Sequence, residues 1–156
     1  MEEPRVGLRI SPATENDVPL IFAFVRKLAE FERLEHRVTA TENDIRECLF
    51  GERRVAEAVI AYLGDTPAGF ALFFHIFSTF AGRPGIYLED LFVDPEHRGR
   101  GVGRALLSYL EGLARERGCD RLQWSVLKWN ERAIDFYKST GAVARDDWTV
   151  YRLDLK

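Results

Sequence analysis

The chain lacks most of the features that mark the specialised classes of protein. It has only two cysteines, Cys48 and Cys119, among 156 residues, which are too few and too far apart for a disulfide scaffold or a zinc site. No apolar run approaches the roughly 18 residues of a membrane span, and the polar start Met-Glu-Glu-Pro-Arg does not resemble a signal peptide. We therefore expect reduced thiols in a soluble, cytoplasmic protein with no membrane partner.

A broad basic surface is also missing. The formal net charge is -3 and the isoelectric point is about 5.7, whereas a general nucleic-acid binder needs a basic face. The histidines His36, His75 and His97 are too scattered to suggest a metal site. We expect no nucleic-acid partner and no metal. Since this length is enough to bury one sizeable core, we also expect one domain over residues 1–156.

Hydrophobic periodicity predicts the order strand, helix, helix, three strands, helix, strand, helix and two final strands. The expected strands are residues 7–11, 55–62, 68–77, 86–93, 122–127, 142–145 and 148–155. The expected helices run from Val18 through Ala29, from the cap at Thr41 to Gly51, from Val102 to Gly118 and from Trp129 to Gly141. The strand at 86–93 is apolar on both faces, which predicts a central place in the sheet.

The stretch from Tyr87 to Arg104 carries the strongest functional signal. Its apolar strand stops at a loop rich in glycine and arginine, with Gly99, Gly101 and Gly103 at alternate positions and Arg98, Arg100 and Arg104 around them. Glycines let a ligand approach the backbone, and the amides of the following helix's first turn bind anions. The loop is therefore predicted to hold an anion, and a pyrophosphate fits this pattern of glycines and arginines.

Two common phosphate motifs do not fit this loop. A Walker loop ends in Gly-Lys-Ser or Gly-Lys-Thr, whereas this one ends in Gly-Val-Gly-Arg. A dinucleotide fingerprint needs glycine where Arg104 stands and an acidic residue where Val126 and Leu127 stand. The pattern that fits is R-x-x-G-x-G, formed by Arg98, Gly101 and Gly103.

This pattern resembles the acetyl-CoA loop of the GCN5-related N-acetyltransferase (GNAT) superfamily. Four further motifs resemble the diamine acetyltransferases, which include the spermidine/spermine and thialysine enzymes: Leu-Ala-Glu-Phe-Glu at 28–32, Tyr-Leu-Glu-Asp at 87–90, Trp-Asn-Glu at 129–131 and Phe-Tyr-Lys at 136–138. The resemblance implies an α/β (α+β) fold, with a mixed, mostly antiparallel sheet of about seven strands flanked by about four helices. It also implies acetyl-CoA as cosubstrate and a homodimer.

The resemblance also implies a set of cofactor-binding residues. The backbone of Leu91, Phe92 and Val93 would pair with the pantetheine arm, and the loop would wrap the pyrophosphate. The full expected set is Leu91, Phe92, Val93, Arg98, Gly99, Arg100, Gly101, Val102, Gly103, Arg104, Asn130, Ala133 and Tyr137. Two of these have structural alternatives, because Asn130 is also a good helix cap and Tyr137 is also a plausible core aromatic.

Acetyl transfer to an amine needs proton transfers, since an alkylammonium with a pKa of about 10 is protonated at neutral pH. The resemblance gives Glu89 the role of base, directly or through water, and Tyr137 that of general acid to the leaving thiolate. The alternative for Glu89 is a strand carboxylate neutralised by an arginine. Because neighbours in a strand face opposite sides, only one of Glu89 and Asp90 is expected to face the cleft. Direct transfer in a ternary complex is expected.

The acceptor is less well defined. Residues expected to contact it are Phe31, Glu32, Glu89, Gln123, Trp124 and Ser125. Only Asp146 and Asp147 precede Trp148, where the polyamine enzymes carry a longer acidic segment, so a lysine-like amine and a polyamine both remain open. The alternatives are a protein or peptide lysine acetyltransferase and a non-catalytic acyl-CoA sensor. The phenylalanines Phe70, Phe73, Phe74, Phe77 and Phe80 are expected to fill the core or a dimer surface.

Overall fold

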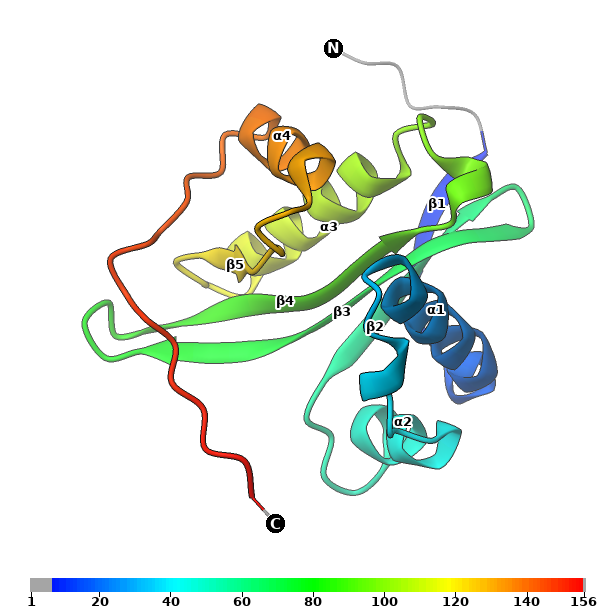
Figure 1. The fold of residues 1–156 in the computed structure, drawn as a ribbon, viewed down its shortest axis with the longest axis horizontal. Helices are drawn as coiled ribbons and strands as arrows, with labels where there is room; N and C mark the ends of the chain where they lie inside the picture. The colour runs from blue at the N-terminus through cyan, green and yellow to red at the C-terminus, as the bar shows by residue number, and fades with distance from the viewer. Residues whose placement is uncertain (1–6, 156) are drawn as a thin grey trace. The chain divides into compact units, whose positions relative to one another are not determined.

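The computed structural model describes residues 7–155, which fall into two compact units, one ending at Trp124 and the other beginning at Ser125 (Figure 1). The strands of the first unit are β1 (Leu8–Pro12), β2 (Glu57–Leu63), β3 (Thr66–Ser78), β4 (Arg83–Val93) and β5 (Leu122–Trp124). Its α-helices are α1 (Val18–Phe31), α2 (Glu42–Phe50) and α3 (Val102–Glu116). The second unit contains α4 (Glu131–Ser139), followed by an extended tail.

The strands form a mixed sheet in the order β1-β2-β3-β4-β5. The first four are antiparallel to their neighbours, and β5 runs parallel to β4. The β2–β3 hairpin turns at Gly64 and Asp65, because Leu63 pairs with Thr66, and Gly64 has a φ of 60° that favours glycine. β4 is an interior strand as predicted, although β3 lies at the middle of the sheet.

One face of the sheet packs against α1 and α2. Phe24 of α1 is the centre of this layer: its ring stacks on Phe70 at 5.5 Å between centroids and lies 5.8 Å from Phe92. Phe70 and Phe92 are a cross-strand pair of β3 and β4, so one helix side chain bridges both strands. Burying an aromatic side chain of this kind contributes about 2–3 kcal/mol. This contact fixes α1 against the strand that precedes the glycine-arginine loop.

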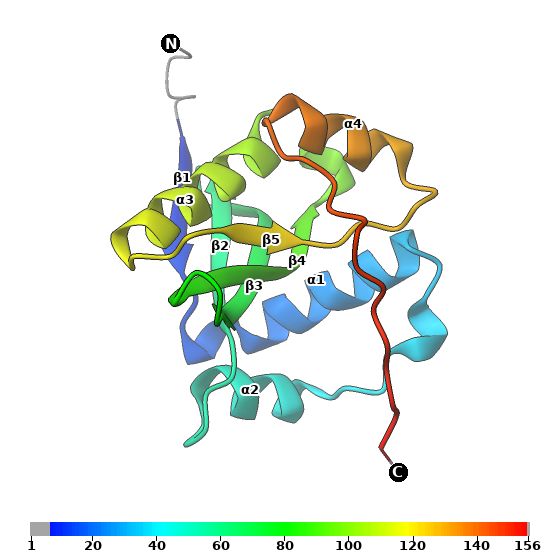
Figure 2. The same ribbon diagram turned by 90° about the vertical axis from the view of Figure 1, so that its left-hand side faces the viewer.

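The other face of the sheet packs against α3 (Figure 2). Its buried stripe follows the helical period that the sequence predicts: Val102, Leu106, Leu107, Leu110 and Ala114. Because helices cover both faces, β3 and β4 are apolar on both sides. The capping box predicted at Thr41 is confirmed, since Thr41 accepts from the Asp44 amide at 3.2 Å and Asp44 accepts from the Thr41 amide at 2.8 Å.

The element order matches the prediction through α4, but the prediction of about seven strands is wrong for the described residues. The sheet has five strands, and residues 142–155 form none. Their alternating pattern resembles a strand, yet a strand requires a ladder partner, and here the apolar side chains stand in solvent. Tyr151 is 93% exposed and Val150 91%. The strand expected at 122–127 also ends early, at Trp124.

Within residues 7–155, no helix is both long enough and apolar enough to cross a membrane. Cys48 is exposed and Cys119 half-buried, and both are free thiols.

Candidate active site

The pairing of β4 with β5 ends before β4 itself does. The last pair in this parallel ladder is Leu88 with Trp124, whereas β4 continues to Val93. From Leu91 to Val93, β4 still pairs with β3 on its other side. The β5-facing edge of this segment therefore has no ladder partner among the described strands. An edge of this kind can form backbone hydrogen bonds with an extended ligand.

A β-bulge lies where the two strands separate. Leu72 pairs with Asp90 and Phe73 pairs with Leu88, so Glu89 is an extra residue in β4. A bulge interrupts the alternation of side chains and re-aims them. The expectation that only one of Glu89 and Asp90 faces the cleft was based on a regular strand, and the bulge interrupts that regularity between these two residues. No local pattern in the sequence signals this bulge.

Asp90 is the most perturbed carboxyl group of the site. Burial, followed by the charges of Glu89 and Glu32, raises the pKa of Asp90 to about 7. Burial also raises the pKa of Glu32, which is the C-cap of α1. Three carboxyl groups from α1 and β4 thus share one region, and Glu89 is the exposed member. This favours a cationic ligand and makes Asp90 a proton acceptor near neutral pH. From the sequence, Asp90 was considered only as the neighbour of Glu89, and a shifted pKa was not predicted.

The loop after β4 has the backbone that its glycines predict. Gly99 and Gly101 both have positive φ, 77° and 80°, and a Cβ built on Gly99 would meet nothing within 4 Å. The loop surface is therefore open at Gly99. Arg98 is half-buried, whereas Arg100 and Arg104 are exposed. The loop therefore carries three arginines on a backbone that a ligand can approach closely at Gly99.

The start of α3 is suited to an anion. Gly101 is the N-cap and offers no side chain to the first-turn amides, and no acidic residue lies in that turn. Such amides attract negative charge, which the helix dipole reinforces. Nearby, His97 has a buried Nδ1 atom with no hydrogen-bond partner among the described residues. The loop therefore presents donors and positive charge together.

Two of the predicted cofactor residues have side chains that are buried in the core. Phe92 is 3% exposed and belongs to the core, and Val102 is 1% exposed on the buried stripe of α3. Their side chains stabilise the fold and hold the adjacent backbone in place.

The predicted acceptor residues of the first unit come from α1, β4 and β5. Gln123 and Trp124 pair with Tyr87 and Leu88, immediately before the bulge. Phe31 is the last residue of α1 and is 39% exposed, beside Glu32. Charge effects on Asp90 place Glu32 and Glu89 in one acidic region.

The remaining predicted residues belong to the second unit and are described within it. Asn130 is the N-cap of α4, where its Oδ1 atom accepts a hydrogen bond from the Ala133 amide at 3.2 Å. The helix-cap role weighed from sequence is therefore present. Tyr137 is half-buried, with its ring 5.6 Å from that of Phe136. Ser125 is exposed and begins this unit.

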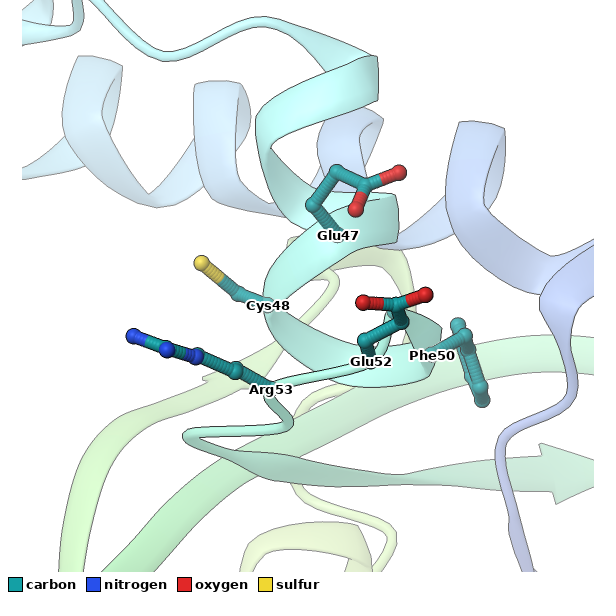
Figure 3. Close-up of a pocket in the computed structure, with 6 residues that line it drawn as sticks. Glu47, Cys48, Phe50, Glu52 and Arg53 are labelled. Carbon is teal, nitrogen blue, oxygen red and sulfur yellow. The ribbon is translucent and has the colours of Figure 1, made fainter.

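A separate hollow lies at the C-terminal end of α2 (Figure 3). It is lined by Glu47, Cys48, Phe50, Gly51, Glu52 and Arg53. In Figure 3, Cys48 and Arg53 extend to one side, while Glu52 and Phe50 extend to the other. The side chains do not converge on a common point, and none belongs to the predicted site.

Comparison with known proteins gives the family. Residues 22–142 match the profile of the Acetyltransferase (GNAT) family. Thialysine N-epsilon-acetyltransferase of Mus musculus is 34% identical over 157 residues, covering 94% of this chain and 92% of the mouse protein. L-ornithine N5-acetyltransferase of Arabidopsis thaliana is 29% identical, covering 96% of this chain and 85% of the plant protein. Among solved structures, an integron cassette protein from the mobile metagenome of V. cholerae matches with a TM-score of 0.79 and 27% identity, covering 96% of this chain and 93% of that one.

The chain therefore belongs to the GNAT family of acetyltransferases. It is an acyltransferase, and the resemblance inferred from the R-x-x-G-x-G loop and the four further motifs is confirmed.

The perturbed carboxyl group of Asp90 predicts a specific pH dependence. Its pKa is higher in the folded chain, about 7, than the ordinary 3.8, so the stability linked to its proton is lost as pH rises through 7. Asp90→Asn removes this loss. Urea denaturation at pH 5 and at pH 8 gives the unfolding free energy at each pH. We expect this free energy to fall between pH 5 and pH 8 by roughly 2 kcal/mol more in the wild type than in Asp90→Asn.

The control for this experiment is Asp65→Asn, which changes an exposed carboxylate at the β2–β3 turn. It should leave the difference between the two pH values unchanged. If the unfolding free energy of the wild type and of Asp90→Asn depended on pH in the same way, the raised pKa of Asp90 would be contradicted.

Proposed function

We propose that the chain transfers an acetyl group from acetyl-CoA to a primary amine of a small molecule. GNAT acetyltransferases use acetyl-CoA as a cosubstrate. The observation that carries the proposal is the junction of β4, its loop and α3. It joins an unpaired strand edge at Leu91 to Val93 with an open, arginine-rich helix start. A pantetheine arm would take the edge, and the phosphates would take the loop.

The proposed acceptor is cationic, either a polyamine or a lysine-like amino acid. The carboxyl groups of Glu32, Glu89 and Asp90 lie on the segments that precede the loop, so negative charge lies beside the expected thioester. Relatives named for thialysine and for ornithine have acceptors with a primary amine on a short side chain. This supports a small amine over a protein tail.

Two proton transfers are required. Glu89, exposed at the bulge, is proposed to take a proton from the ammonium, directly or through water. Tyr137 on α4 is proposed to donate a proton to the leaving thiolate, whose expulsion as an anion is costly in a dry site. The neutral amine then attacks the acetyl carbon directly: the C–N bond forms, the C–S bond breaks, and the nitrogen releases its second proton, which replaces the proton that Tyr137 gave to the thiolate. No covalent enzyme intermediate is needed.

The first test measures thiol release from acetyl-CoA with spermidine, putrescine, thialysine, ornithine and a histone-tail peptide. We expect turnover with at least one small amine, with kcat/KM at least about tenfold higher than for the peptide, since each tenfold step reflects 1.4 kcal/mol of transition-state binding. A preference for the peptide would instead favour a protein acetyltransferase. Tight CoA binding without turnover of any amine would favour a sensor.

The role of Tyr137 is tested by Tyr137→Phe, which removes only the hydroxyl group. Loss of the general acid should lower kcat by about ten- to a thousandfold while CoA affinity stays nearly unchanged. Tyr109→Phe, on α3, is the matched control and should retain full kcat. An unchanged kcat in Tyr137→Phe would remove this residue from the mechanism.

We also propose that the chain forms a homodimer through its C-terminal tail. The tail is extended and makes no ladder within the described sheet. Its large apolar side chains are exposed: Trp148 78%, Val150 91%, Tyr151 93%, Leu153 85% and Leu155 90%. Such a segment stabilises a structure only when another strand or surface covers it. In the proposed dimer, the identical tail of a second copy of the chain would cover these apolar side chains.

Light scattering coupled to size exclusion tests this assembly. The wild type should elute at twice the chain mass of 17.9 kDa, and the double variant Trp148→Ser, Tyr151→Ser should elute as a monomer, because burial of both aromatic rings is lost. Phe80→Ser changes a ring that is 98% exposed at the β3–β4 turn and should leave the dimer intact. Dissociation by Phe80→Ser alone would assign the interface to the phenylalanines instead.

A further inference from the structure

Helix α1 contacts the segment after β4 at two points that lie one turn apart. Lys27 forms an ion pair with Asp94, with Nζ 2.8 Å from Oδ2. Phe31, four residues later, lies under the guanidinium of Arg98, whose carbon is 4.8 Å from the ring centroid. Residues at i and i+4 share one face of a helix. A single face of α1 therefore contacts both Asp94 and Arg98.

These two partners are the ends of a short helical turn. Asp94 is the N-cap and Arg98 the C-cap of η3 (Pro95–His97). Arg98 is also the first residue of the R-x-x-G-x-G pattern. The α1 face thus contacts the turn at the point where β4 ends and at the point where the anion-binding loop begins.

Asp94 connects three elements. Its Oδ2 atom accepts from Lys27 of α1, its Oδ1 atom accepts from the Glu96 amide at 3.2 Å, and its own amide donates to the Ala68 carbonyl of β3 at 2.8 Å. Its side chain is only 14% exposed. The hydrogen bond to Lys27 lowers the pKa of Asp94 and raises the pKa of Lys27. A pair with one largely buried partner is worth more than an exposed surface pair.

The contact between Arg98 and Phe31 is compatible with anion binding. A guanidinium stacks through its flat face, whereas its N–H groups lie in the plane and meet phosphates edge-on. Holding Arg98 in this way before a ligand arrives lowers the entropic cost of ordering this long side chain on binding.

We propose that Lys27 and Phe31 make α1 the positioning element of the anion-binding loop: α1 holds η3 at both ends and so sets the place of Arg98. Lys27 itself binds no ligand. This inference rests on the proposed binding of acetyl-CoA by the loop. It gives α1, which ends at the acidic acceptor region, a second role in cofactor affinity.

The test measures CoA binding by titration calorimetry without any amine, so that contacts with the acceptor do not contribute. Lys27→Met removes the charge but keeps the stem, and we expect its Kd for CoA to rise about three- to tenfold, with kcat at saturating acetyl-CoA within about twofold of the wild type. Lys27→Arg keeps the ion pair and should bind within about twofold of the wild type.

Arg26→Met is the matched control, because Arg26 is the neighbouring exposed cation of α1 and its guanidinium lies over Phe22. It removes the same charge without touching η3. Equal loss of CoA affinity in Lys27→Met and Arg26→Met would overturn the inference, since the effect would then be general attraction of an anion. Failure of the wild type to bind CoA would overturn the proposed function itself.

Phe31→Leu gives a second measurement that does not depend on Lys27. Leucine keeps an apolar side chain but removes the aromatic face, so CoA affinity should fall about two- to fivefold, corresponding to an exposed cation–π contact. Unchanged CoA affinity in both Phe31→Leu and Lys27→Met would also overturn the inference.

Discussion

The early end of the β4–β5 ladder is the constraint on which the rest of the site depends. Pairing stops at Leu88 and Trp124, while β4 continues to Val93 and pairs there, among the described strands, only with β3. The backbone N–H and C=O groups of a strand segment without a ladder partner need hydrogen bonds from water, from another segment or from a ligand. The bulge at Glu89 lies next to the last β4–β5 pair and interrupts the alternation of side chains along β4.

Charge is separated along a single short segment of chain. Glu89 and Asp90 lie at the bulge, and the arginines begin at Arg98, after the turn η3. Burial next to two other carboxyl groups favours the protonated form of Asp90, which an arriving cation would reverse. The arginine loop, by contrast, attracts negative charge. The proposed anionic donor and cationic acceptor would thus be attracted to adjacent parts of one strand-loop-helix unit.

Much of the fold and the position of the loop could be predicted because they depend on local sequence. Helical period and capping residues located α1, α2 and α3, and the spacing of Arg98, Gly101 and Gly103 identified the family. The bulge, the pKa of Asp90 and the pair of Lys27 with Asp94 depend on contacts distant in sequence. Lys27 and Asp94 are 67 residues apart. The prediction of strands in the tail was wrong because an alternating apolar pattern indicates that a segment can pair but does not supply the strand with which it pairs.

The most direct test of the central claim is amide hydrogen exchange with and without CoA. If the strand edge and the loop hold the cofactor, CoA should slow exchange in residues 91–93 and 99–104, because these amides would gain bonds to the pantetheine and the phosphates. Peptides from α2 should be unaffected. Binding of CoA with no protection in either segment would contradict the account.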